Sequence, residues 1–181
     1  ALPIAKLIAG RHHERSMRGG TTNVPPVLGM AQALRIASAE LEKNAAYVTS
    51  LRDRFIKRVL AEIPYVKLNG HPEKRLPANA NFSFRYIEGE SLLFSLDLKD
   101  IAVSSGSACS SGSLEPSHVL LAMGLPEGLA HGSIRFSFGK DNTVEQVDYA
   151  VDALKEITVK LRALSPLFPK DLKNEVYEKE I

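Results

Sequence analysis

Apolar residues recur at helical spacing in two long stretches of the chain. From 27 to about 60 they repeat at intervals of three, four and seven, with arginines and glutamates between them. This spacing predicts one long amphipathic helix that ends before Pro64. A second long helix is expected from Thr143, which forms a capping box with Gln146. Its apolar face consists of Val147, Ala150, Val151, Leu154, Ile157 and Leu161.

Shorter patterns lie between these two helices. Short helices are expected from Glu90 to Leu98 and from Pro116 to Met123, the second with proline in its first turn and Gly124 as its C-terminal stop. Alternating or compact apolar runs predict strands at 65–68, 79–86, 101–103 and 132–138. The sequence therefore predicts an α+β fold, in which a small sheet of three or four short strands is covered by two long helices.

The ends of the chain show weaker patterns. Residues 1–26 contain paired glycines and paired prolines and are expected to be a loop. The stretch 165–181 has two prolines and many charges and is expected to be a loosely ordered tail. The chain opens at Ala1 in an apolar segment that has no helix-start signal. Either the N-terminus is processed or the chain is a piece of a longer protein, and composition alone leaves both open.

Composition narrows the class of protein. The 181 residues are 44% hydrophobic and 24% charged, which fits one globular domain. The 23 basic and 21 acidic residues give a net charge of +2, which argues against a dedicated nucleic-acid binder. No apolar run approaches the roughly 20 residues of a membrane span, and no signal peptide is recognised. A single cysteine excludes an internal disulfide and indicates a reducing compartment, so a cytoplasmic location is expected.

The single cysteine, Cys109, lies in the segment SSGSACSSGS, residues 104–113. A structural cysteine normally has apolar neighbours. Here its neighbours are small residues, mostly serine and glycine, that could not form a core, so we expect an exposed thiol on the most mobile internal segment of the chain. A nucleophilic thiol needs access and a lowered pKa, and a persulfide carrier also needs freedom to move. The alternative is a flexible linker with an incidental cysteine, and composition alone favours that alternative.

Two further features could bind a ligand. Arg135 lies in the middle of the strand at 132–138, where its planar guanidinium could bind a carboxylate with two hydrogen bonds. The alternative is an arginine on a solvated sheet face. The run 12–23 combines histidine, arginine, glycine and threonine and could hold a phosphate, although such runs also form plain solvated loops. No histidine has convincing metal-ligand spacing, so no metal site is predicted. The chain has no Walker-type loop, Rossmann fingerprint or CxxC motif.

Four motifs together resemble one family. HERSMRGGTTNVP, NANFSFRYIEGESLL, AVSSGSACSSGSLEPSHVLLAMGL and AHGSIRFSFG occur in the order and spacing of the cysteine desulfurases. These are pyridoxal-phosphate-dependent members of the class V aminotransferases. The chain is most similar to the nitrogen-fixation and iron–sulfur-cluster type with a long cysteine loop. The resemblance extends from about Pro3 to Pro166, and with it Cys109 becomes the candidate active-site thiol.

The resemblance implies a domain organisation. The chain would be the C-terminal portion of a fold-type I pyridoxal-phosphate enzyme. Residues 1–26 would end the large cofactor domain with a phosphate-contacting loop, 27–164 would form the small domain with the cysteine loop 104–113, and 165–181 would be the tail. The lysine that holds the cofactor lies upstream in the family, and Lys6 does not match its motif. The chain alone is therefore expected to be inactive.

The resemblance also implies residue roles. Cys109 matches the nucleophile that takes sulfur as a persulfide, and Arg135 matches the arginine that binds the substrate carboxylate. Thr21 matches the threonine presented to the cofactor phosphate of the opposite subunit, which implies a homodimer, and Arg18 would help to place its loop. Gly19 departs from the serine of many members, without consequence for the chemistry.

The full enzyme would convert L-cysteine to L-alanine and pass the sulfur to an iron–sulfur cluster scaffold protein. Two other functions remain open on the sequence alone. One is a selenocysteine lyase-like enzyme, against which the long cysteine loop argues. The other is a non-enzymatic persulfide relay or scaffold-docking module.

Overall fold

The computed structural model describes residues 17–105 and 116–169, together with Ala5, Ile8, Gly10 and Arg15. The chain divides into two compact units, Ala1–Glu42 and Lys43–Ile181. The domain limits that the family resemblance implies, which are 1–26, 27–164 and 165–181, stay a prediction.

The expected helix at 27–60 is two helices. Helix α1 spans Val24–Ala39 and α2 spans Leu41–Glu62, with Glu40 between them. The two prolines predicted to lie in a loop occupy the first turn of α1. Proline is accepted there because its missing N–H would have no partner within the helix. No residue of α1 is buried.

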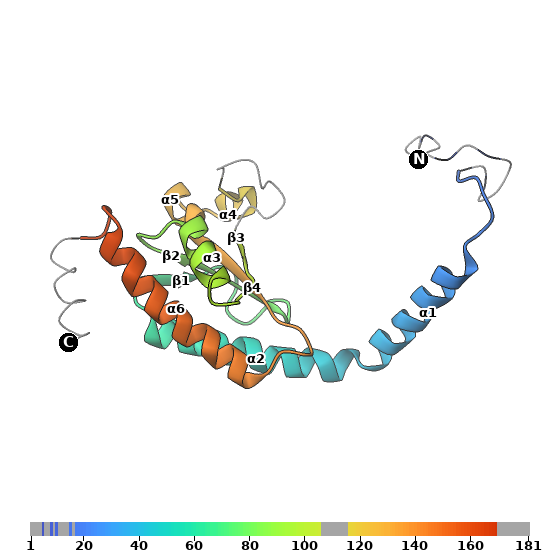
Figure 1. The fold of residues 1–181 in the computed structure, drawn as a ribbon, viewed down its shortest axis with the longest axis horizontal. Helices are drawn as coiled ribbons and strands as arrows, with labels where there is room; N and C mark the ends of the chain where they lie inside the picture. Colours follow the sequence, from blue (N-terminus) through green and yellow to red (C-terminus); the bar gives the residue numbers. More distant parts are fainter. Residues whose placement is uncertain are drawn as a thin grey trace. The chain divides into compact units, whose positions relative to one another are not determined.

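The second unit contains a four-stranded antiparallel sheet in the order β1-β2-β4-β3 (Figure 1). Besides most of α2, the second unit contains β1 (Val66–Leu68), β2 (Asn79–Phe84), α3 (Gly89–Asp97), β3 (Ser104–Ser105), α4 (His118–Ala122), α5 (Glu127–His131), β4 (Ser133–Ser137) and α6 (Val144–Leu164). Helices α2 and α6 lie side by side along this sheet (Figure 1). The predicted α+β architecture is confirmed, and so is the capping box of Thr143 at the start of α6.

The core lies on one face of the sheet. In β2 and β4 alternate side chains point to it, and Phe82 pairs across the strands with Ile134. Phe55 of α2 packs its ring against Phe82 and Phe136, with ring centroids 6.0 and 4.7 Å apart. The apolar faces of α3 and α6 complete this cluster. The other sheet face carries the alternate, polar residues.

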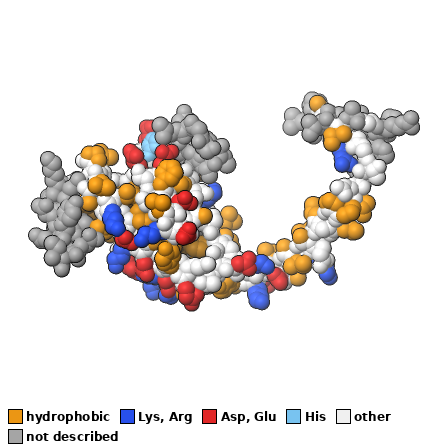
Figure 2. All heavy atoms as spheres, in the orientation of Figure 1, with side chains coloured by type: hydrophobic (Ala, Val, Ile, Leu, Met, Phe, Trp, Pro, Cys, Tyr) orange, Lys and Arg blue, Asp and Glu red, His pale blue; other side chains and the backbone are white. Residues whose placement is uncertain are grey.

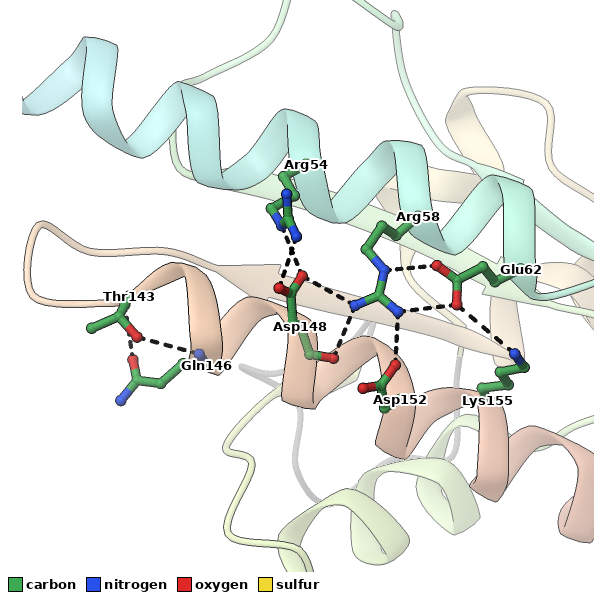
Figure 3. A network of polar contacts seen from close by, with 8 residues as sticks. All are labelled: Arg54, Arg58, Glu62, Thr143, Gln146, Asp148, Asp152 and Lys155. Atoms are coloured by element: carbon green, nitrogen blue, oxygen red, sulfur yellow. Dashed lines mark hydrogen bonds and ion pairs between the residues drawn. The ribbon is translucent and has the colours of Figure 1, made fainter.

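Charged side chains join α2 to α6 at their surface. Arg54 binds Asp148 at 2.7 Å, and Arg58 binds Asp148, Asp152 and Glu62 at 3.0, 2.7 and 2.7 Å (Figure 3). Figure 2 shows side chains of both signs together over these two helices. Most of these groups are partly exposed, so the network aligns the helices more than it stabilises them.

Two local predictions differ from the structure, and one helix was not predicted. The expected strand at 101–103 is irregular, and the pairing with β4 falls on Ser104–Ser105 instead. The predicted helix at 116–123 begins at His118 with Ser117 as its N-cap, so proline lies before it. Gly124 has φ +82° directly after this helix, as expected of a C-terminal stop. Helix α5 was not predicted from the sequence.

The start of the expected tail is ordered. Phe168 is 2% exposed and packs edge-on against Tyr65 and Tyr86, at 5.9 and 5.4 Å between ring centroids. Beside it, Arg162 stacks over the Tyr65 ring at 5.5 Å, and burial lowers the pKa of its guanidinium to about 10. The prediction of loose order is therefore wrong for 165–169, because an aromatic anchor holds that segment. Residues 170–181 lie outside the described part of the chain.

Candidate functional site

A row of polar residues crosses the sheet on the face opposite the core. Asn81 of β2 lies opposite Arg135 of β4, and Arg135 lies opposite Ser104 of β3. Asn69, just after β1, donates its backbone N–H to the Asn81 carbonyl at 2.8 Å. We call these four residues the polar row. They come together because strand alternation places every second residue on one face and the antiparallel register aligns those residues.

One end of the polar row is rigid. Asn69 is 4% exposed, and its Nδ2 donates to Asn81 Oδ1 at 2.7 Å and to Ser83 Oγ at 2.9 Å. Arg75 Nη2 donates to the Asn69 carbonyl at 2.6 Å, and burial lowers the pKa of this guanidinium. The Asn81 amide next to Arg135 is therefore held in a fixed orientation.

Arg135, the predicted carboxylate-binding residue, lies in the middle of this row. Its side chain is exposed, and its Nη2 donates to Ser104 Oγ at 3.2 Å. Within the described residues it makes no ion pair, a property that it shares with other arginines such as Arg85. A guanidinium has five N–H donors, so four remain for a ligand. The arrangement can bind a carboxylate with two parallel hydrogen bonds.

The segment that contains Cys109 follows this row directly. Ser105, the last residue of β3, pairs with Ile134, next to Arg135. Residues 106–115 lie outside the described part of the chain, and Cys109 is among them. The cysteine loop predicted at 104–113 differs at its start, because Ser104 and Ser105 form strand β3, and its other residues lie outside the described part of the chain.

Thr21 belongs to the first unit and precedes α1. It is exposed and follows Gly20, which has φ +94°. Arg18 Nη1 donates to the carbonyls of Gly20 and Thr21 at 3.4 and 3.3 Å. An exposed hydroxyl, a cation and a glycine turn fit a phosphate group. This loop could therefore contact the phosphate of pyridoxal phosphate.

Sequence reasoning missed the two neighbours of Arg135. Ser104 was assigned to a loop because a two-residue strand has no pattern of its own. Asn81 could have been found, since it alternates with Phe82 in a strand that was predicted correctly. Across the described ranges, no group of three or more His, Cys, Asp or Glu residues is arranged to hold a metal ion. No helix in those ranges is long and apolar enough to cross a bilayer.

Known proteins similar to the chain point to one family. It is 50% identical over 168 residues to the cysteine desulfurase IscS of Methanosarcina thermophila, covering 93% of this chain and 41% of the relative. It is 52% identical over 162 residues to the cysteine desulfurase IscS of Pseudomonas putida, covering 90% of this chain and 39% of that protein. The chain thus spans about two-fifths of the length of the curated relatives it matches.

Solved structures similar to the chain point to the same family. A NifS-like protein matches with a TM-score of 0.71 and 35% identity, covering 86% of this chain and 39% of the other. The NifS-like protein of Rickettsia africae matches with a TM-score of 0.71 and 30% identity, covering 86% and 40%. The family model described as aminotransferase class-V matches residues 7–150. The chain therefore belongs to the class-V aminotransferase family.

Proposed function

We propose that this chain supplies the substrate-binding and sulfur-accepting part of a pyridoxal-phosphate-dependent cysteine desulfurase. The observation that carries the proposal is the position of Arg135. This guanidinium has no carboxylate partner among the described residues, and it pairs across strands with Ser104, from which the chain runs into the Cys109 segment. Similarity at 50% identity to cysteine desulfurases supports the same reaction.

In this proposal Arg135 binds the α-carboxylate of L-cysteine. The thiolate of Cys109 attacks the substrate sulfur, a new S–S bond forms, and the substrate carbon–sulfur bond breaks. The carbon fragment keeps the bonding electron pair, takes up a proton and leaves as L-alanine, while Cys109 is left as a persulfide. Three residues lie between Ser105 and Cys109, so four consecutive peptide units join their Cα atoms and covalent geometry keeps these atoms within about 14 Å of each other. The thiol can therefore reach a substrate bound near the polar row.

The cofactor would be held largely by residues outside this chain. Pyridoxal phosphate, when bound, withdraws electrons from the substrate carbon skeleton. Thr21 would contact its phosphate from the opposite subunit of a homodimer, with Arg18 holding the loop. Because Lys6 does not match the lysine motif of the family, we place the cofactor lysine outside these 181 residues. The sulfur acceptor would be an iron–sulfur cluster scaffold protein in the cytoplasm.

Two substitutions in the complete enzyme test this function. Arg135→Ala should weaken L-cysteine binding by about 2–5 kcal/mol, because it removes a charge-assisted pair. Cys109→Ser should still bind L-cysteine and change the cofactor absorbance at ordinary substrate concentration. It should form no alanine, because a serine hydroxyl cannot accept sulfur as a persulfide.

The matched control is Arg85→Ala, which removes an exposed arginine just after β2. Alanine formation and the absorbance titration should match the parent enzyme in this variant. Equal spectra and equal residual rates for Arg135→Ala and Cys109→Ser would show that the proposed division of roles is wrong.

A further inference from the structure

We infer that Ser104 is a positioning residue for Arg135. Its hydroxyl oxygen would hold the guanidinium in the orientation that receives the α-carboxylate of the substrate. The inference rests on the proposed function, because carboxylate binding by Arg135 is part of it. It adds a residue that the family resemblance did not mark and that the sequence alone placed in a loop.

The geometry gives Ser104 a direct hold on the guanidinium. Ser104 and Arg135 are partners across β3 and β4, and Arg135 Nη2 donates to Ser104 Oγ at 3.2 Å. Within the described ranges, the Arg135 side chain makes no hydrogen bond other than this one. An exposed arginine otherwise samples many rotamers, and it loses this rotational freedom when it binds a ligand in one orientation. One fixed N–H removes part of that freedom before the substrate arrives.

The bond to Ser104 is compatible with substrate binding. It uses one of the five donors of the guanidinium, and a two-fold contact with a carboxylate needs two more. Because the serine oxygen is neutral, it orients the cation without neutralising it. An aspartate at position 104 would instead form an ion pair with Arg135 and compete with the substrate. The residue type at 104 therefore determines how far Arg135 is available to a ligand.

Strand β3 also contains a residue that serves as a matched control for Ser104. Ser105 is the next residue of β3 and pairs with Ile134, whose side chain is fully buried in the core. Successive side chains of a strand point to opposite faces, so the Ser105 hydroxyl lies on the face away from Arg135. Ser105→Ala removes the same hydroxyl from the same short strand and leaves the Ser104 contact in place.

The test is steady-state kinetics of the complete enzyme with L-cysteine, together with calorimetric titration of L-alanine, which carries the same carboxylate. Ser104→Ala should raise the KM for L-cysteine and the Kd for L-alanine about three- to tenfold, the effect of one hydrogen bond to a charged group with partial exposure, and leave kcat close to the parent value. Ser104→Thr keeps the hydroxyl and should restore both constants. Ser104→Asp should raise both more than alanine does.

Each outcome of these measurements either supports or overturns the inference about Ser104. If Ser104→Ala matches Ser105→Ala in KM and Kd, or if threonine fails to rescue, positioning by the hydroxyl is overturned while the proposed function stands. A fall in kcat with unchanged KM would also overturn it, since that pattern reports a general structural role. Arg135→Ala, measured alongside, tests the proposed function itself. If that variant keeps the parent KM, both the carboxylate role of Arg135 and the inference about Ser104 fail.

Discussion

Replacing Phe55 by alanine should destabilise the sheet domain strongly. Phe55 has 0% exposure and joins α2 to the core face of the sheet. Its ring packs against Phe82 of β2 and Phe136 of β4, and against Phe138 with centroids 5.4 Å apart. We expect Phe55→Ala to lower the free energy of unfolding by about 3–5 kcal/mol.

The magnitude follows from what surrounds the ring. Truncation removes the transfer free energy of a buried ring and leaves a cavity, and aromatic pairs add about 0.5–1.5 kcal/mol each beyond buried area. The strands cannot close the cavity easily, since the register that pairs Phe82 with Ile134 also fixes their backbones. A single domain is typically stable by about 5–15 kcal/mol, so the loss is a large fraction of the total.

The assay is urea denaturation followed by far-UV circular dichroism, because the chain contains no tryptophan for fluorescence. The matched control is Leu60→Ala on the same helix, where the leucine is 49% exposed. That control should change stability by about 0.5 kcal/mol or less. A loss below about 1 kcal/mol for Phe55→Ala would refute the reasoning, because it would mean that the ring is not enclosed by the sheet.

Two other predictions concern the surface network and a close backbone contact. Hydrogen bonds from Arg54 lower the pKa of Asp148 from 3.8 to about 2, so its contribution to stability is present above pH 3.8 and is lost as the pH falls from there through about 2. Asp148→Asn should flatten the fall of the urea midpoint over this range, whereas Asp141→Asn should leave it steep. At Gly132 an added Cβ would lie 2.5 Å from the carbonyl oxygen of the last residue of β2, so Gly132→Ala should cost about 1–3 kcal/mol in urea denaturation. Gly128→Ala meets open space and should cost nothing, and equal midpoints for the two glycine variants would contradict the close approach.

Elements with a local signal could be predicted from the sequence. The alternation of Phe82 and Phe84 with polar residues gave β2, and the pairing of Thr143 with Gln146 gave the start of α6. The break at Glu40 could not be predicted, because the apolar repeat continues on both sides of it and neither glycine nor proline marks it. The periodicity reports which face of a helix is apolar, and it does not report where one helix ends and the next begins.

The candidate site was predictable only in part, for a related reason. Arg135 stood out because it lies in a strand with clear alternation. The polar row also needs residues 69, 81 and 104, which meet only when the register between three pairs of strands is known. Register depends on turn geometry and on which face is buried, so it is a property of the folded domain. The Ser104 contact therefore required the structure.

The two faces of the sheet explain why Arg135 can stay without a carboxylate partner in the described structure. On the core face an unpaired guanidinium would be very costly, whereas on the polar face water solvates it. The same water weakens any ion pair made there, and exposed pairs contribute only about 0–1 kcal/mol. The 2–5 kcal/mol expected for Arg135 in the complete enzyme therefore requires that another surface covers the polar face and excludes water around the bound carboxylate. A chain that spans about two-fifths of its relatives leaves room in those proteins for such a surface. The orientation supplied by Ser104 then acts where it matters most, at a guanidinium whose remaining donors face a substrate and not solvent.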